Sequence, residues 1–142
     1  MQLAHLLGGD SGRTRAFAAI ARCVRPGGTL ALTILREPLP ASGTPEPLPD
    51  VREVEGWVHS SLPLAVRVGP SSVELDRLRQ LVAPDGTLTE ELVTTVLDRI
   101  TPAALERELA SAGLRVSGSE PVAETAEHVG SLLVLAERGA DG

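Results

Sequence analysis

Three histidines, one tryptophan and a pair of arginines are the side chains of this sequence best suited to chemistry. His59 follows Trp57 by two residues, so in an extended segment both point to one face, as a pocket floor or as a cover over the core. His5, in LAHLL, is either a cleft-facing donor or base with a pKa near neutrality, or a terminal residue without a chemical role. His128, in TAEHVGS, either caps its loop or lines a pocket.

Two arginines alternate with apolar residues in SVELDRLRQLV. If this segment is a strand, Arg77 and Arg79 share a face with Val73, Leu75 and Leu81. Their aliphatic stems then cover apolar surface while the charged heads reach water, or the two guanidinium groups face a cleft and bind an anionic group. The sequence leaves both alternatives open.

The sequence lacks the residue patterns of a metal site, a disulfide framework and a nucleophile motif. The histidines do not stand with carboxylates at metal-ligand spacing, so we predict no metal site. Cys23 is the single cysteine, which excludes a disulfide framework. No G-x-S-x-G nucleophile motif occurs. The acidic pairs Glu90-Glu91 and Glu106/Glu108 are predicted to be solvated, so the catalytic residues stay unknown.

Composition narrows the class of protein. The 142 residues suffice for a single domain, 1–142, with a modest core. One Phe, one Trp and no Tyr offer no stacking platform, and a net charge of −6 repels phosphate backbones, so we predict no nucleic-acid partner. No apolar run reaches transmembrane length and no secretory signal begins the chain, which predicts a cytoplasmic protein without membrane contact.

The first half of the chain is predicted to hold one helix, one strand and extended arms. The helix is capped by Asp10 or Ser11 and ends at Arg25, because Pro26 disfavours a helical residue before it. A strand over 29–35 follows, and then a loop over 36–52 with five prolines. The segment 57–68 is predicted to be extended, and 72–97 to form a hairpin around Pro-Asp-Gly.

The second half begins with a helix whose ends are marked locally. Thr101 caps it, Pro102 occupies its first position, and Gly113 fits the left-handed position after its end. Strands are predicted over 114–122 and 132–136, the latter in the interior of a sheet. The connection between them is too short for a crossover helix, so the two strands are antiparallel.

Three stretches in this order resemble the C-terminal half of a class I S-adenosylmethionine-dependent methyltransferase. VRPGGTLAL resembles the turn into the fifth strand of that sheet, ITPAALERELASAGLRV the helix before the sixth strand, and HVGSLLVLAER the antiparallel seventh strand. The expected fold is therefore α/β, a partial Rossmann-like methyltransferase sheet of the last three core strands with the final pair antiparallel, plus an added β-hairpin.

The resemblance also implies functional residues. The hairpin is similar to strands that several small-molecule methyltransferases place over the substrate pocket, which implies substrate contacts from Trp57, His59, Arg77, Arg79 and His128. His5 falls in the segment near the cofactor, S-adenosylmethionine. The implied reaction is methyl transfer to a small molecule, in which the protein mainly aligns the reacting atoms.

The motifs that bind the cofactor in this family are missing from the sequence. The Gly-rich stretch at 8–12 has no adequate strand before it, and on its position it resembles the loop after the fourth strand. An uncovered sheet edge beside 29–35 is therefore expected, in a truncated relative that forms a homo-oligomer or recruits a partner chain to cover the edge. The alternative is a non-catalytic interaction domain that associates through this edge.

Overall fold

The computed structural model describes residues 3–39, 41–44, 49–125 and 129–140. They form two compact units. Residues 1–39 with 98–142 are unit 1, and residues 40–97 are unit 2. This division does not test the prediction that 1–142 is one domain equivalent to the substrate-side half of a methyltransferase domain, which stays a prediction.

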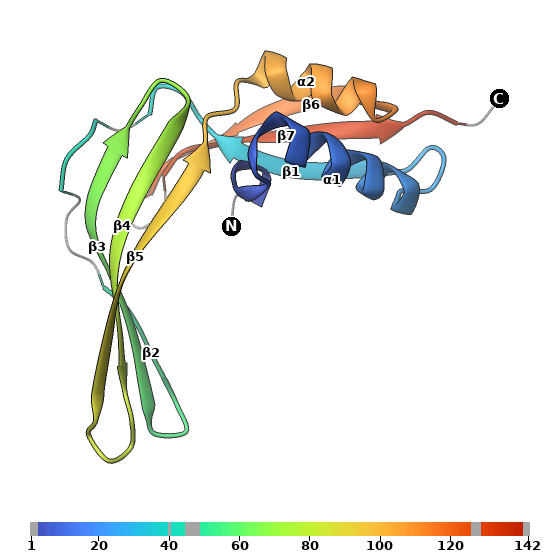
Figure 1. Cartoon of the computed structure of the whole chain (residues 1–142). Coiled ribbons are helices and arrows are strands. Elements are labelled where there is room, and N and C mark those ends of the chain that lie inside the picture. Colours follow the sequence, from blue (N-terminus) through green and yellow to red (C-terminus); the bar gives the residue numbers. More distant parts are fainter. Residues whose placement is uncertain (1–2, 40, 45–48, 126–128, 141–142) are drawn as a thin grey trace. The chain divides into compact units, whose positions relative to one another are not determined.

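Unit 1 is an antiparallel sheet with helices packed against it (Figure 1). Its strands are β1 (Thr29–Leu35), β6 (Leu114–Val122) and β7 (Ser131–Arg138), in the order β1-β7-β6. Its helices are the short 3-10 helix η1 (Leu3–Leu6), α1 (Gly9–Cys23) and α2 (Pro102–Ser111). The strand predicted over 29–35 has the bounds that the sequence indicated, and the predicted interior strand lies between the other two, antiparallel to both.

The first helix begins without the predicted cap. Its N-cap residue is Gly8, at a φ of 78°, and no side chain of the cap accepts a hydrogen bond. Caps at Asp10 or Ser11 are therefore wrong. The Asp98 side chain accepts the Gly9 N–H instead, at 2.7 Å, and supplies a negative charge where the helix dipole favours one. Gly12 must lack a side chain, because a Cβ there would lie 1.7 Å from the Leu7 carbonyl oxygen.

The second helix has the ends that the sequence predicted. The Thr101 side chain accepts the Ala104 N–H at 3.2 Å, and Pro102 begins the helix. Gly113 follows at a φ of 79°, in the left-handed region that glycine enters without cost. The chain can then turn directly into β6, and Leu114 is fully buried.

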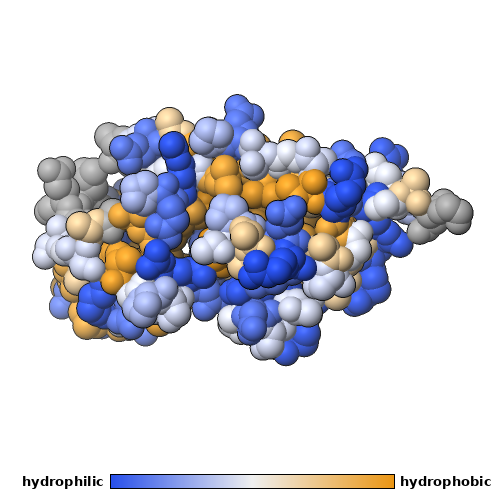
Figure 2. All heavy atoms as spheres, turned by 90° about the horizontal axis from the view of Figure 1, so that it is seen from above, coloured by the Kyte–Doolittle hydropathy of each residue, from blue (hydrophilic) through white to orange (hydrophobic). Residues whose placement is uncertain are grey.

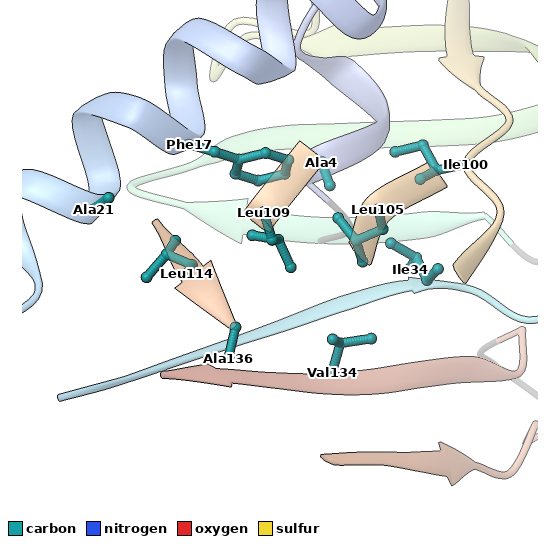
Figure 3. Packing of buried hydrophobic residues seen from close by; sticks show 10 residues of the cluster. All are labelled: Ala4, Phe17, Ala21, Ile34, Ile100, Leu105, Leu109, Leu114, Val134 and Ala136. Atoms are coloured by element: carbon teal, nitrogen blue, oxygen red, sulfur yellow. The ribbon is translucent and has the colours of Figure 1, made fainter. Parts of the chain in front are cut away.

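The core of unit 1 lies between the helices and one face of the sheet (Figure 3). The pairs Leu30–Ala136, Leu32–Val134 and Ile34–Leu132 lie on that face. Its other apolar side chains come mainly from the helices: Phe17 and Ala21 from α1, Leu105 and Leu109 from α2. The sequence predicted the helix residues correctly because they recur at three- and four-residue spacing.

Unit 2 is a four-stranded sheet. Its strands are β2 (Asp50–Val54), β3 (Trp57–Val68), β4 (Ser72–Val82) and β5 (Leu88–Asp98), in the order β2-β3-β4-β5. The predicted hairpin corresponds to β4 and β5, and the extended segment to β3, whose register shifts between Pro63 and Ala65.

The end of the proline-rich loop joins this sheet, which the sequence did not predict. Residues 50–52, assigned to the loop 36–52, belong to β2, and Gly43 pairs with Val66 through an isolated bridge. The β2–β3 connection is the two-residue turn Glu55-Gly56, with φ values of 53° and 80°. Two positive φ values are typical of the type I′ turn that matches strand twist.

Candidate functional site

An open hollow of about 610 Å³ lies on the sheet of unit 2, and it holds two of the predicted site residues. All four strands contribute to it. Its charged and polar lining includes Asp50, Arg52, His59, Ser61, Arg79 and Glu91.

The strand register explains why these side chains meet. Arg52 lies opposite His59 on the neighbouring strand, and Ser61 lies opposite Arg79. Opposite residues of antiparallel strands share a face of the sheet, and residues two apart on one strand do too. The imidazole of His59 and the guanidinium of Arg79 therefore lie near each other on one face of the sheet.

The two predicted arginines differ in how they are held. Arg77 donates from Nε to the Ser61 hydroxyl at 2.8 Å, and its guanidinium lies 3.8 Å from the Asp50 carboxylate. Arg79 is exposed, and within the described part of the chain no hydrogen bond or ion pair engages its side chain. Arg79 thus keeps its donors for a ligand, whereas Arg77 uses a donor within the sheet.

The remaining predicted substrate residues fall outside this hollow. Trp57 is 41% exposed and shares the face of β3 with His59, but does not line the hollow. His128 lies outside the described residues. His5 belongs to the other unit. The structure therefore brings together His59, Arg79 and, beside them, Arg77; their binding of a substrate stays a prediction.

His5 is buried and bonded at both ring nitrogens. Nδ1 donates to the Asp98 carbonyl oxygen, and Nε2 accepts the Leu35 N–H at 2.9 Å. Burial lowers the pKa of His5 below its usual 6.5, outweighing the hydrogen bond to Asp98, which raises it. The ring is neutral and holds η1 against β1; it is not the cleft-facing base with a pKa near neutrality that one alternative expected. Its contact with a cofactor stays a prediction.

A buried ion cluster lies beside His5, and sequence reasoning missed it. The Arg13 side chain is 7% exposed and binds both carboxylate oxygens of Glu108, at 2.7 and 2.8 Å. A third donor of Arg13 reaches the Asp98 carboxylate at 2.9 Å. The hydrogen bonds to Glu108 raise the pKa of Arg13, so it stays charged. The prediction that Glu108 is solvated is wrong, since its side chain is 13% exposed. The signal was its spacing, three residues after Leu105 and four before Ala112 of the apolar stripe.

The outer edge of β1 has unpaired backbone groups. Just outside the strand, the Gly28 carbonyl accepts the Arg138 N–H and the Arg36 N–H donates to the Gly130 carbonyl. Because hydrogen bonding alternates along an antiparallel strand, the even-numbered residues of β1 hydrogen-bond to β7. The N–H and C=O groups of Ala31 and Thr33 consequently point to the other side, where the described residues supply no strand. The uncovered edge predicted beside 29–35 is therefore present in the described structure.

An apolar hollow of about 330 Å³ runs along this edge. Thr33 is its only polar lining residue among the described ones; the others include Leu3, Leu7, Phe17, Ile20 and Leu32. S-adenosylmethionine needs polar partners for its ribose, amino and carboxylate groups. This hollow is apolar and both ring nitrogens of His5 are engaged, so the hollow does not supply those polar partners.

No group of three or more His, Cys, Asp or Glu side chains in the described ranges is arranged to hold a metal ion. No helix there is both long and apolar enough to cross a membrane. Apolar residues nevertheless reach the surface between charged ones, as the face in Figure 2 shows.

Solved structures similar to this chain include methyltransferases. A SAM-bound amino pentose methyltransferase of Micromonospora echinaspora, involved in calicheamicin biosynthesis, is 20% identical with a TM-score of 0.64, over 97% of this chain and 55% of its own. A sugar N-methyltransferase of a Streptoalloteichus species is 17% identical with a TM-score of 0.69, over 98% and 53%. DesVI of Streptomyces venezuelae is 15% identical with a TM-score of 0.69, over 99% and 56%. No family model and no curated protein matches the sequence.

These likenesses establish the fold. The chain spans about half the length of the solved structures that it matches, and almost all of the chain is included in each match. The resemblance to a C-terminal half of a class I methyltransferase, and the α/β fold class that it implied, are thus confirmed as statements about fold. At these identities, what the chain does is a separate question.

Proposed function

We propose that this chain is the substrate-side half of an S-adenosylmethionine-dependent methyltransferase that acts on a small molecule. The observation that carries the proposal is the fold likeness, which includes nearly all of this chain yet only 53–56% of each methyltransferase-like neighbour. In this proposal another polypeptide segment supplies the polar partners of the cofactor, because the hollow beside β1 is apolar. Activity then requires both halves.

The free edge of β1 supports this division of roles. Ala31 and Thr33 offer unpaired backbone groups to an added strand, and the adjacent apolar hollow of about 330 Å³ would be filled by that strand's side chains. The hollow of unit 2 supports a substrate-binding role. His59 and Arg79 lie there with donors that nothing in the described residues uses, and Arg77 positions Ser61 beside them.

Calorimetric titration with S-adenosylhomocysteine tests the proposal. We expect no binding to the chain alone. We expect binding when the N-terminal half of the amino pentose methyltransferase is fused before residue 1, because the fusion restores both sides of the sheet. A fusion that unfolds cooperatively by circular dichroism, and is therefore folded, yet does not bind S-adenosylhomocysteine would contradict the proposal.

The alternative is a non-catalytic interaction domain, and the same β1 edge favours it. In that case the edge pairs with a partner chain or with a second copy that brings no cofactor site. Light scattering on the purified chain, beside the calorimetry, separates the two. A defined complex that leaves S-adenosylhomocysteine unbound in every fusion favours the interaction domain.

A further inference from the structure

Apolar side chains are exposed along one face of β5, an edge strand of unit 2. Leu88, Leu92 and Val96 are 52%, 68% and 53% exposed. They are four residues apart, so they share a face of the strand, and the residues between Leu92 and Asp98 on the opposite face are half-buried. An edge strand with apolar side chains in water is a template for pairing with another strand.

The other edge strands of the two sheets are either poorly suited to pairing with another strand or already have a proposed partner. The edge strand β2 has only five residues and carries Asp50, Arg52 and Glu53. The edge strand β6 contains Pro121 and a register shift before Gly118. Short length, charge, proline and bulges all discourage pairing. The edge of β1 belongs to the missing half in the proposal above, whereas the run LVTTVL within β5 has no charge and no proline.

We propose that β5 pairs antiparallel with β5 of a second copy of this chain, around a two-fold axis at Leu92. In this register Leu92 lies opposite itself, and Leu88 of each copy lies opposite Val96 of the other. Three apolar pairs thus form on the exposed face. The proposal rests on unit 2 alone and goes beyond the methyltransferase function, so it stands or falls separately.

The charges of β5 are compatible with this register. Glu90 lies opposite Thr94 and Glu91 opposite Val93, so no two carboxylates face each other. The antiparallel arrangement also brings the two Asp98 residues to opposite ends of the paired strands, so the chains that follow them leave in opposite directions. A self-complementary patch of this kind is what an isologous dimer requires.

The contact area is limited to one pair of edge strands, which is at the low end of specific interfaces. We therefore expect a dissociation constant on the order of micromolar. Sedimentation velocity of the full chain over a concentration series across that range should show a mass that rises from one chain toward two. A chain that stays monomeric throughout would overturn the proposal.

Leu92→Arg tests the surface. It puts two like charges opposite each other at the axis, and at 68% exposure it removes little core packing. We expect a monomer at every concentration. Val51→Arg is the matched control, an apolar residue 62% exposed on the opposite edge strand, and it should dimerise like the wild type. A dimer that survives Leu92→Arg, or is lost in Val51→Arg with its fold intact by circular dichroism, would overturn the proposal.

A cross-link tests the register without depending on a destabilising charge. In a Cys23→Ser background, Leu92→Cys places one thiol of each copy at the two-fold axis, where opposite strand residues lie within disulfide reach. Mild oxidation should give a covalent dimer with Leu92→Cys and none with Val51→Cys. Equal cross-linking of both variants, or of neither, would overturn the Leu92-centred pairing.

Discussion

At the scale of single residues, His5 acts as a structural connector. Its ring joins the carbonyl of Asp98, the last residue of β5, to the N–H of Leu35, the last residue of β1. Both bonds require a neutral ring with the proton on Nδ1. A protonated ring could not accept the Leu35 N–H, so His5 holds this end of the sheet only while it is neutral.

We predict that the free energy of unfolding falls as the pH is lowered below about 6.5 because of His5. Its pKa is lowered in the folded state, so below 6.5 the unfolded chain binds more protons and is favoured. Above 6.5 the ring is neutral in both states and the effect vanishes. Arg99 lowers the pKa of Glu37 and Arg67 lowers that of Asp76. These two carboxylates therefore lose their contribution to the unfolding free energy only at more acidic pH.

Urea unfolding between pH 5 and pH 7.5 measures this effect, with His5→Gln as the control. The unfolding free energy of the variant should be lower at neutral pH. It should fall less steeply as the pH is lowered, because the contribution of His5 is absent. The other two histidines are present in both proteins, so their contributions cancel in the comparison. Parallel pH curves for the two proteins would show that His5 does not titrate as described.

At the scale of elements, Arg13 lies in α1 and binds Glu108 of α2. It also binds Asp98, whose carboxylate accepts the Gly9 N–H at the start of α1. We predict that Arg13→Ala destabilises the chain by about 3–5 kcal/mol, because it leaves the buried Glu108 carboxylate without a partner. Arg13→Met combined with Glu108→Leu should recover most of the loss, since apolar residues of similar volume remove both charges. Thermal and urea unfolding of the variants measure the differences, and a double variant no better than Arg13→Ala would contradict the role of the unpaired charge.

The elements that the sequence predicted well are those with local signals. Thr101 and Pro102 begin α2, Gly113 ends it, and Pro84-Asp85-Gly86 connects β4 to β5, all through contacts within a few residues. The cap of α1 could not be predicted in this way, because Asp98 is 89 residues from Gly9.

The same reason limits prediction of the candidate site. Spacing placed His59 with Trp57 on a face of one extended segment, and Arg77 with Arg79 on a face of another. The register of β3 and β4 places His59 on the same side of the sheet as the two arginines, which spacing alone did not predict. Which arginine is engaged depends on Ser61 and on Asp50 of the neighbouring strands. The strand β2 was missed because DVREV has no apolar alternation and follows the prolines, so it forms by pairing with β3 rather than by its own propensity.

At the scale of the whole molecule, the edge of β1 decides whether the chain is one half of a larger sheet. Residues of this strand alternate between bonding β7 and facing the free edge. Substitution by proline removes one backbone N–H and is tolerated in strands where that N–H faces away from the ladder. Prolines at neighbouring positions therefore probe the two edges of the same strand separately.

We predict that Thr33→Pro changes the unfolding free energy of the isolated chain by less than about 1 kcal/mol, because its N–H makes no ladder bond. Leu32→Pro removes a bond to β7 and should cost about 2 kcal/mol or more. In the fusion with an N-terminal methyltransferase half, Thr33→Pro is no longer harmless. It should abolish binding of S-adenosylhomocysteine, since the added strand needs the N–H of residue 33. If the fusion with Thr33→Pro binds the ligand as well as its parent, β1 does not pair with the added half, and the free edge must be covered in some other way.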